Sequence, residues 1–119
     1  MLVYVNKRIS EYGEHDMREA TDLHASLCQA IAEPTRISIL YALNEKPCHV
    51  NELVTQLQIP QATISRHLKV LREQSLVETR REGAFITYSL GYQRIIKALD
   101  IMRSIKLDII RKEHDLIHE

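Results

Sequence analysis

The chain has 119 residues, 45% of them hydrophobic, with no tryptophan and one phenylalanine. This length suits one domain, or one domain with helical extensions, and a core of Leu, Ile and Val suits packed helices. Lysine plus arginine equals aspartate plus glutamate at 16 each, so no positive field over the whole molecule indicates nucleic acid.

Two cysteines, Cys28 and Cys48, are too few for the disulfide framework of a secreted fold. The start, MLVYVNKRIS, is too short and too polar for a signal peptide, and no apolar run approaches the length of a membrane span. We therefore expect a soluble intracellular protein with no membrane partner.

The N-terminal part is predicted to be helical after a short arm. Residues 1–15 show no clear period and are expected to form a loose arm. From Asp16, an acceptable N-cap, apolar residues at helical spacing predict a helix over 16–32. Glu33 and Pro34 end this helix and start another, because proline fits the first turn of a helix.

The central part has the order of a helix-turn-helix over residues 51–74. Asn51 caps a short helix, and Pro60 ends the linker before a second helix. The apolar positions of that second helix recur at helical spacing and are Ile64, Leu68 and Leu71.

Strand-like alternation follows over 76–90, with a turn at Glu82-Gly83-Ala84, and predicts a β-hairpin. Its inward-facing side chains are predicted to be Ile86, Tyr88 and Leu90. Residues 92–118 predict a long helix whose apolar stripe a small domain cannot cover: Ile95, Leu99, Met102, Ile105, Ile109 and Leu116. The predicted class is mostly α with a β-hairpin wing, a winged helix-turn-helix with helices added at both ends.

The helix after Pro60 has a small, polar first turn and a core-packing far end. Such a helix can enter the major groove, where Gln, Thr, Ser and Arg read base edges. Arg80 and Arg81, near the hairpin tip, are placed to hold adjacent phosphates. The alternative is a solvated helix face in a structural bundle.

The stretches QAIAEPTRISILYAL, HVNELVTQL, QATISRHLKVLRE and LVETRREGAFITYSL resemble the ArsR/SmtB family of prokaryotic metal- and stress-sensing repressors. The resemblance covers about residues 23–91. It implies a cytoplasmic, nucleoid-associated homodimer that binds palindromic double-stranded operator DNA and leaves it when an inducer binds. It also implies that the helices at 16–32 and 92–118 build the dimer interface.

The DNA-contacting residues that follow from this resemblance and from the helix pattern are Gln61, Thr63, Ser65, Arg66, His67 and Lys69, with Arg80 and Arg81 on the wing. Two positions depart from the family pattern. Pro60 replaces a capping serine, and Ser75 replaces a glycine at a turn where a left-handed residue costs about 1 kcal/mol.

The family's thiolate box, Cys-Val-Cys-Asp-Leu, reads HVNEL at 49–53 here, which does not suit thiolate-only binding of arsenite or cadmium. Cys48 and His49 remain candidates for a borderline ion such as Zn²⁺, with His15, Asp16 or His24 completing the site across the dimer. The alternative is a surface connector with two incidental polar residues.

The family's second metal site, on the terminal helix, is altered because Met102 and Leu116 stand where ligands are needed. His114 and His118 are an i, i+4 pair that can share a metal, or a solvated pair at a helix end.

Cys28 is predicted to be a small buried hydrophobe. The alternative is a thiol sensor in which Cys28 and Cys48 are joined or modified on oxidation. The inducer is therefore expected to be a metal ion or a thiol oxidant, with an unrecognised small molecule or no inducer left open.

An enzyme is not expected, because the chain has no Gly-rich phosphate loop, nucleophile elbow or paired-carboxylate motif. A winged-helix protein-interaction module without DNA binding is the alternative function.

Overall fold

The computed structural model describes residues 17–118, with side chains for residues 17–117. The predicted arm at 1–15 lies outside the described residues. A first helix covers residues 17–30, and the elements after it are α2 (Pro34–Glu45), α3 (Val50–Leu57), α4 (Gln61–Glu73), β1 (Val77–Glu82), β2 (Phe85–Leu90) and α5 (Arg94–His118). The predicted winged helix-turn-helix class is confirmed.

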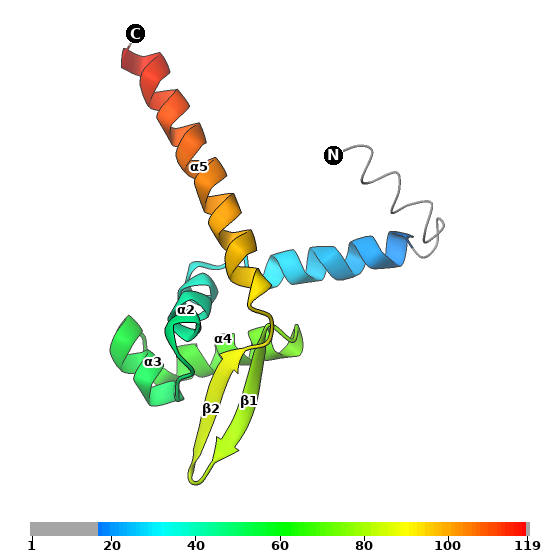
Figure 1. The fold of residues 1–119 in the computed structure, drawn as a ribbon, viewed down its shortest axis with the longest axis vertical. Helices are drawn as coiled ribbons and strands as arrows, with labels where there is room; N and C mark the ends of the chain where they lie inside the picture. The colour runs from blue at the N-terminus through cyan, green and yellow to red at the C-terminus, as the bar shows by residue number, and fades with distance from the viewer. Residues whose placement is uncertain (1–16, 119) are drawn as a thin grey trace.

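The helices α2, α3 and α4 form a small body from which the β-hairpin extends on one side (Figure 1). The first helix and most of α5 leave this body in different directions. The radius of gyration is 17.9 Å, whereas a compact chain of this length has about 13 Å. Within residues 17–118, no helix combines the length and hydropathy that a membrane span needs.

One hydrophobic core joins α2, α3, α4, the base of the wing and the start of α5. Its most deeply buried side chains are Ile39, Leu40, Cys48, Leu53, Ile64, Leu68, Leu71 and Val77. In α4 the buried apolar residues Ile64, Leu68 and Leu71 are four and three positions apart, which places them on one side of the helix. Only Ile95, Ile96 and Leu99 of α5 are buried, so the core ends within its first two turns.

The two strands pair antiparallel, from Val77 opposite Leu90 at the base to Glu82 opposite Phe85 at the tip. Gly83 has a φ of +62° in the turn between them, a conformation that suits glycine. The prediction that Ile86 faces inward is wrong: it is 46% exposed, while Thr87 is buried. The hairpin extends beyond the core at this point, so nothing lies beneath Ile86.

A tight junction connects α4, the wing and α5. Ser75 has a φ of +60°, as expected for the position where the family has glycine, and the N–H of Leu76 bonds back to the carbonyl of Leu71 at 3.0 Å. Gly91 lies against this turn, and a Cβ there would come within 2.1 Å of the Ser75 carbonyl oxygen. Glycine at 91 therefore allows the wing and α4 to meet.

Candidate nucleic-acid interface

The two sides of α4 have opposite characters. Ile64, Leu68 and Leu71 are at most 1% exposed and hold the helix on the core. The other side presents polar side chains, and those exposed are Gln61, Ser65, Arg66 and Lys69, with Thr63 half-buried. The helix is thus fixed by one face while hydrogen-bonding groups cover the other.

The N-terminus of α4 is open. Pro60 is its N-cap, no side chain accepts a hydrogen bond from the first turn, and that turn contains no acidic residue. The first N–H groups of a helix have no intrahelical acceptor and attract anions such as phosphate. The loss of a capping side chain, noted in the sequence, leaves these donors available.

His67 does not share the exposed face, contrary to the prediction that it contacts DNA. It is buried, its Nδ1 lies 3.2 Å from an Arg36 guanidinium nitrogen, and its Nε2 lies 3.7 Å from a Glu33 carboxylate oxygen. The cause is rotation along α4, because position 67 lies three residues after Ile64 and four before Leu71, on the buried side of the helix. Arg36 and Glu33 were not among the predicted site residues, because the only local signal near them was the helix start at Glu33-Pro34.

Glu33 and Arg36 connect the first helix to α2 and α4. Arg36 donates to the carbonyl oxygens of Ala30 and Gln29, and its backbone N–H donates to Glu33 at 3.0 Å. Partial burial raises the pKa of Glu33, but the hydrogen bonds from the Arg36 and Thr35 amides and the nearby His67 and Arg36 charges outweigh it and lower the pKa overall. Glu33 is therefore held as a carboxylate.

Arg80 and Arg81 lie on the outer half of the wing and are both exposed. Arg80 is opposite Thr87 and Arg81 is opposite Ile86, so the two guanidinium groups extend from opposite faces of the hairpin. Arg80 comes within 4.0 Å of Glu82, a weak exposed pair. The wing thus carries two positively charged side chains beyond the core, and the same protomer also carries the polar face of α4.

Residues 33–79, which contain α2, α3, α4 and the first wing residues, match the bacterial regulatory protein, arsR family. The nodulation protein NolR of Rhizobium meliloti is 32% identical over 104 residues, which are 87% of this chain and 82% of NolR. The chain belongs to the ArsR family. This is a family of transcriptional regulators and not of enzymes.

The repressor SmtB of Mycobacterium tuberculosis is 40% identical over 74 residues, 62% of this chain, and that match spans 55% of SmtB. Among solved structures, a homodimeric winged helix-turn-helix DNA-binding domain from Mycobacterium bovis superposes with a TM-score of 0.72 at 25% identity, covering 84% of this chain and 94% of that one.

In place of the ArsR thiolate box, this chain has Cys48, whose thiol is buried, and His49, whose two ring nitrogens both contact other side chains. Cys48 is fully buried and its Sγ donates to the Lys46 carbonyl oxygen at 3.3 Å. Burial, with the charge of Glu52, raises the pKa of the Cys48 thiol, which disfavours the thiolate that binds metal. His49 contacts Glu52 and Thr87 through its two ring nitrogens.

The remaining sensor candidates are dispersed. Cys28 is exposed in the protomer, on the helix predicted to join the dimer interface, so its burial stays a prediction. His114 lies 3.9 Å from Asp115 on the distal part of α5, and the side chains of His15, Asp16 and His118 lie outside the described residues. Among the residues whose placement is described, no three His, Cys, Asp or Glu side chains gather as a metal site.

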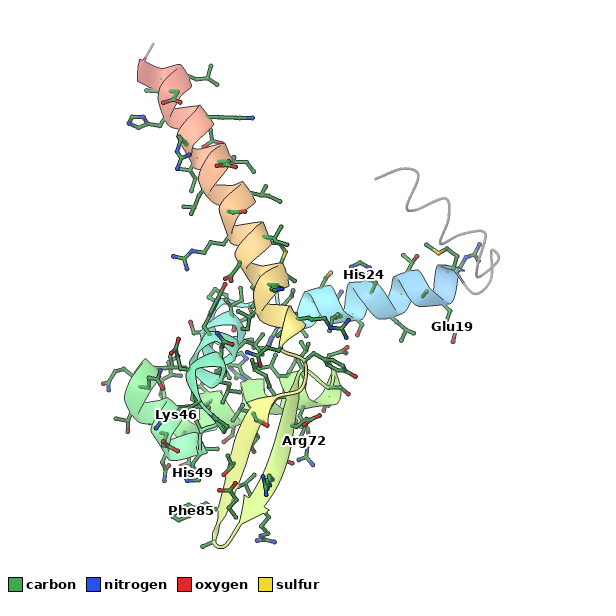
Figure 2. The ribbon with its side chains drawn as sticks, in the orientation of Figure 1. Glu19, His24, Lys46, His49, Arg72 and Phe85 are labelled. Carbon is green, nitrogen blue, oxygen red and sulfur yellow. The ribbon has the colours of Figure 1, made fainter. Side chains whose placement is uncertain are left out.

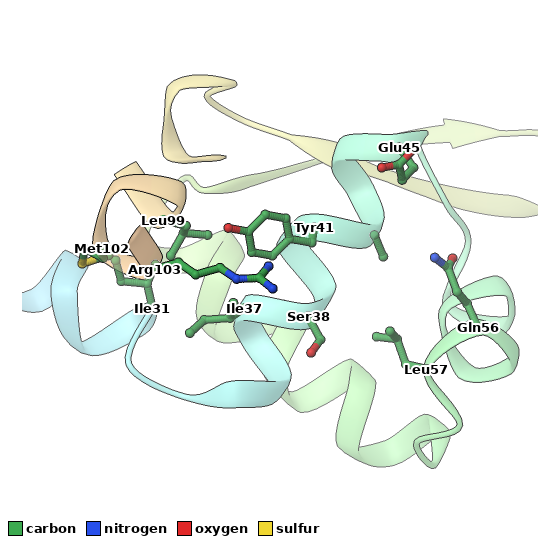
Figure 3. A pocket seen from close by; sticks show the side chains of 11 residues that line it. Ile31, Ile37, Ser38, Tyr41, Glu45, Gln56, Leu57, Leu99, Met102 and Arg103 are labelled. Carbon is green, nitrogen blue, oxygen red and sulfur yellow. The ribbon is translucent and has the colours of Figure 1, made fainter. Parts of the chain in front are cut away.

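A groove of about 830 Å³ separates the base of α5 from α2 and the end of α3 (Figure 3). Its walls are mainly apolar, and Tyr41 donates to the Asp100 carboxylate across it at 2.6 Å. That hydrogen bond, followed by burial, raises the pKa of Tyr41. Leu99 and Met102 line the groove and continue into the exposed apolar side of α5, so the groove belongs to the surface around that helix.

Proposed function

We propose that this chain is a homodimeric transcriptional repressor that binds palindromic operator DNA and is released by an inducer. The observation that carries the proposal is the polar, exposed face of α4, held from behind by a fully buried apolar face. In this proposal Ser65 and Arg66 read base edges in the major groove, with Gln61, Thr63 and Lys69 beside them. The open N-terminus of α4 faces a phosphate.

The wing supports the same site. Arg80 and Arg81 contact phosphates next to the groove that α4 enters, and they contribute affinity more than sequence choice. His67 is left out of the proposed contacts because its ring is buried against Glu33 and Arg36.

The second copy covers the apolar surface that one protomer leaves open. The exposed apolar side chains on α5 are between 43% and 79% exposed and are Ile101, Met102, Ile105, Leu107, Ile109, Ile110, Leu116 and Ile117. An exposed apolar surface of this extent indicates a partner. Two-fold pairing through the first helix and α5 would relate two α4 helices by the same symmetry as the halves of a palindrome, which is why we propose a palindromic site.

The DNA test uses a duplex that the parent protein enriches from a randomised library, with affinity followed by fluorescence anisotropy. Arg66→Ala should weaken binding by about 1–3 kcal/mol, the value of one good base contact. The matched control is Arg72→Ala, because Arg72 is an exposed arginine in the last turn of the same helix. Equal affinities for Arg66→Ala and the parent would remove Arg66 from the interface.

A winged helix used for protein contact is the second candidate. It predicts that no duplex is enriched and that Arg66→Ala is without effect on any nucleic acid. The exposed face of α4 argues for DNA, because it holds no large apolar side chain of the kind that protein interfaces concentrate.

We infer that the inducer is a thiol oxidant acting at Cys28, or a metal ion at histidines. Cys28 is the exposed thiol, whereas Cys48 is buried with a raised pKa. The test follows DNA release by zinc, nickel, copper, arsenite and hydrogen peroxide in turn, for the parent, Cys28→Ser and Cys48→Ser. If peroxide releases the DNA from the parent but not from Cys28→Ser, the sensor is Cys28. If a metal ion releases the DNA from the parent and from both cysteine variants, the sensor is a histidine site. If no agent releases the DNA, the inducer is removed from the proposal.

A further inference from the structure

The ring of His49 is packed between the helix-turn-helix and the wing. It stacks on Phe85 with ring centroids 4.8 Å apart and planes inclined by 22°. Its Nδ1 lies 3.4 Å from the hydroxyl of the buried Thr87. Figure 2 shows His49 and Phe85 together beside the outer half of the wing. One side chain from the start of α3 therefore touches two residues of β2.

The orientation of this ring is set from the α3 side. His49 is the N-cap of α3, and its backbone N–H donates to Glu52 at 3.0 Å. The same Glu52 oxygen lies 3.7 Å from His49 Nε2, and Lys46 binds the other Glu52 oxygen at 3.1 Å. With Glu52 near one ring nitrogen and Thr87 near the other, the imidazole has little freedom to turn away from Phe85.

A backbone bridge from the segment before α3 reaches the wing at the middle of β2. Cys48 and Tyr88 form a two-way bridge, with N···O distances of 3.0 and 2.8 Å. Phe85 lies three residues further out, which is about 10 Å along an extended strand. Arg80 and Arg81 pair with Thr87 and Ile86, on the side of the bridge toward the tip. Arg80 and Arg81 therefore lie beyond the backbone bridge. This part of the hairpin contacts the body through the His49 side chain.

We propose that His49 is a positioning residue for DNA binding: its stack on Phe85 and its contact with Thr87 hold the outer wing, and with it Arg80 and Arg81, at a fixed angle to α4. This inference rests on the proposed DNA-binding function. His49 occupies the first position of the family's thiolate box, and here that position serves the wing. The ring itself does not touch DNA.

The experiment is a double-mutant cycle between His49 and Arg81, measured on the duplex that the parent enriches. Arg81 is chosen because it extends from the hairpin face opposite to Phe85 and Thr87, so the two side chains influence each other only through the wing. His49→Ala should weaken binding about three- to tenfold, the scale of a lost phosphate contact. In the His49→Ala background, Arg81→Ala should then have little further effect.

Two more variants separate positioning from direct contact. His49→Phe keeps a ring to stack on Phe85 but has no nitrogen for DNA, and it should restore most of the affinity and the Arg81 effect. Phe85→Ala should reproduce His49→Ala. The control Gln56→Ala removes an exposed polar side chain from the later part of α3 and should bind as the parent does. Phe85 is 56% exposed, so Phe85→Ala carries the test if His49→Ala does not fold.

Additive losses in His49→Ala and Arg81→Ala would overturn the inference, as would a His49→Phe variant as weak as His49→Ala. Parent-like binding by both His49→Ala and Phe85→Ala would overturn it too. Failure of the parent to enrich any duplex is a different result, because it removes the proposed function on which the inference rests.

Discussion

The two cysteines differ in surroundings although both lie next to helix ends. Cys28 is exposed on the first helix, and Cys48 is buried between the Lys46 carbonyl and the core. A thiol reacts as its thiolate, so burial and the Glu52 charge, which raise the pKa of Cys48, also slow its alkylation. The folded state keeps the Cys48 proton more tightly than the unfolded state does. The resulting stability is complete below the ordinary thiol pKa and is lost as pH rises through the higher folded value.

We expect Cys48 in the Cys28→Ser protein to react with iodoacetamide only when the chain opens. The rate at neutral pH should fall at least on the order of tenfold below that of the same protein in denaturant. Mass spectrometry over time provides the measurement, and Cys28 in Cys48→Ser provides the comparison. Equal rates in native and denaturing conditions would contradict the burial of Cys48.

Ser75 has a left-handed backbone conformation, with a φ of +60°. Replacement by glycine removes the steric cost of the Cβ, so Ser75→Gly should raise the free energy of unfolding by about 1 kcal/mol. Ser89→Gly is the matched control in an extended strand, where glycine should lower it by about 0.5–1 kcal/mol. Urea denaturation of both variants tests the sign, and a destabilised Ser75→Gly would contradict the expectation.

Residue-level prediction succeeded where a local rule was sufficient. The left-handed Ser75 and the uncapped Pro60 could be recognised as departures from the family pattern at single positions. The pairing of His67 with Arg36 could not, because the two residues are 31 positions apart and their contact depends on how α2 crosses α4.

At the scale of elements, Arg36 determines how the first helix leaves the body. Its guanidinium donates to the last carbonyls of that helix and contacts His67 on α4, so one α2 side chain joins three helices. Arg36→Ala leaves these partners without a donor and should lower the free energy of unfolding by about 1–3 kcal/mol.

Arg18→Ala is the matched control, because Arg18 is exposed on the first helix and its loss should change stability by less than about 0.5 kcal/mol. Chemical denaturation compares the two variants at one protein concentration. An Arg36→Ala protein as stable as Arg18→Ala would show that the junction has no role in stability.

The order of elements was predictable because periodicity and the proline and glycine breaks are local signals. The orientation of the wing was not, since it depends on the contacts of His49 with Phe85 and Thr87. The alternation of apolar and polar residues predicted that Ile86 is buried. That prediction was wrong because such a pattern does not show where the core ends.

For the whole molecule, α5 has a buried base and an exposed distal part. Because Ile109 lies in the apolar stripe proposed to meet the second copy, Ile109→Glu should disrupt the dimer. Ser104→Glu adds the same charge about 140° around α5 from Ile109, outside the stripe that Ile109 shares with Ile105 and Leu116, and should weaken the dimer less. Sedimentation velocity at micromolar concentration distinguishes these outcomes, and a monomeric parent would contradict the proposed assembly.

The short core contact of α5 also bears on how long the protein survives. Among the side chains that the structure describes, every α5 residue beyond Leu99 is exposed, so in the proposed dimer the order of this helix depends on the concentration of the second copy. Dilution below the dimer dissociation constant then exposes a long apolar segment to proteases, and the degradation rate rises as the open population grows. The abundance of the regulator would thereby set its own half-life, with scarce protomers removed faster than paired ones.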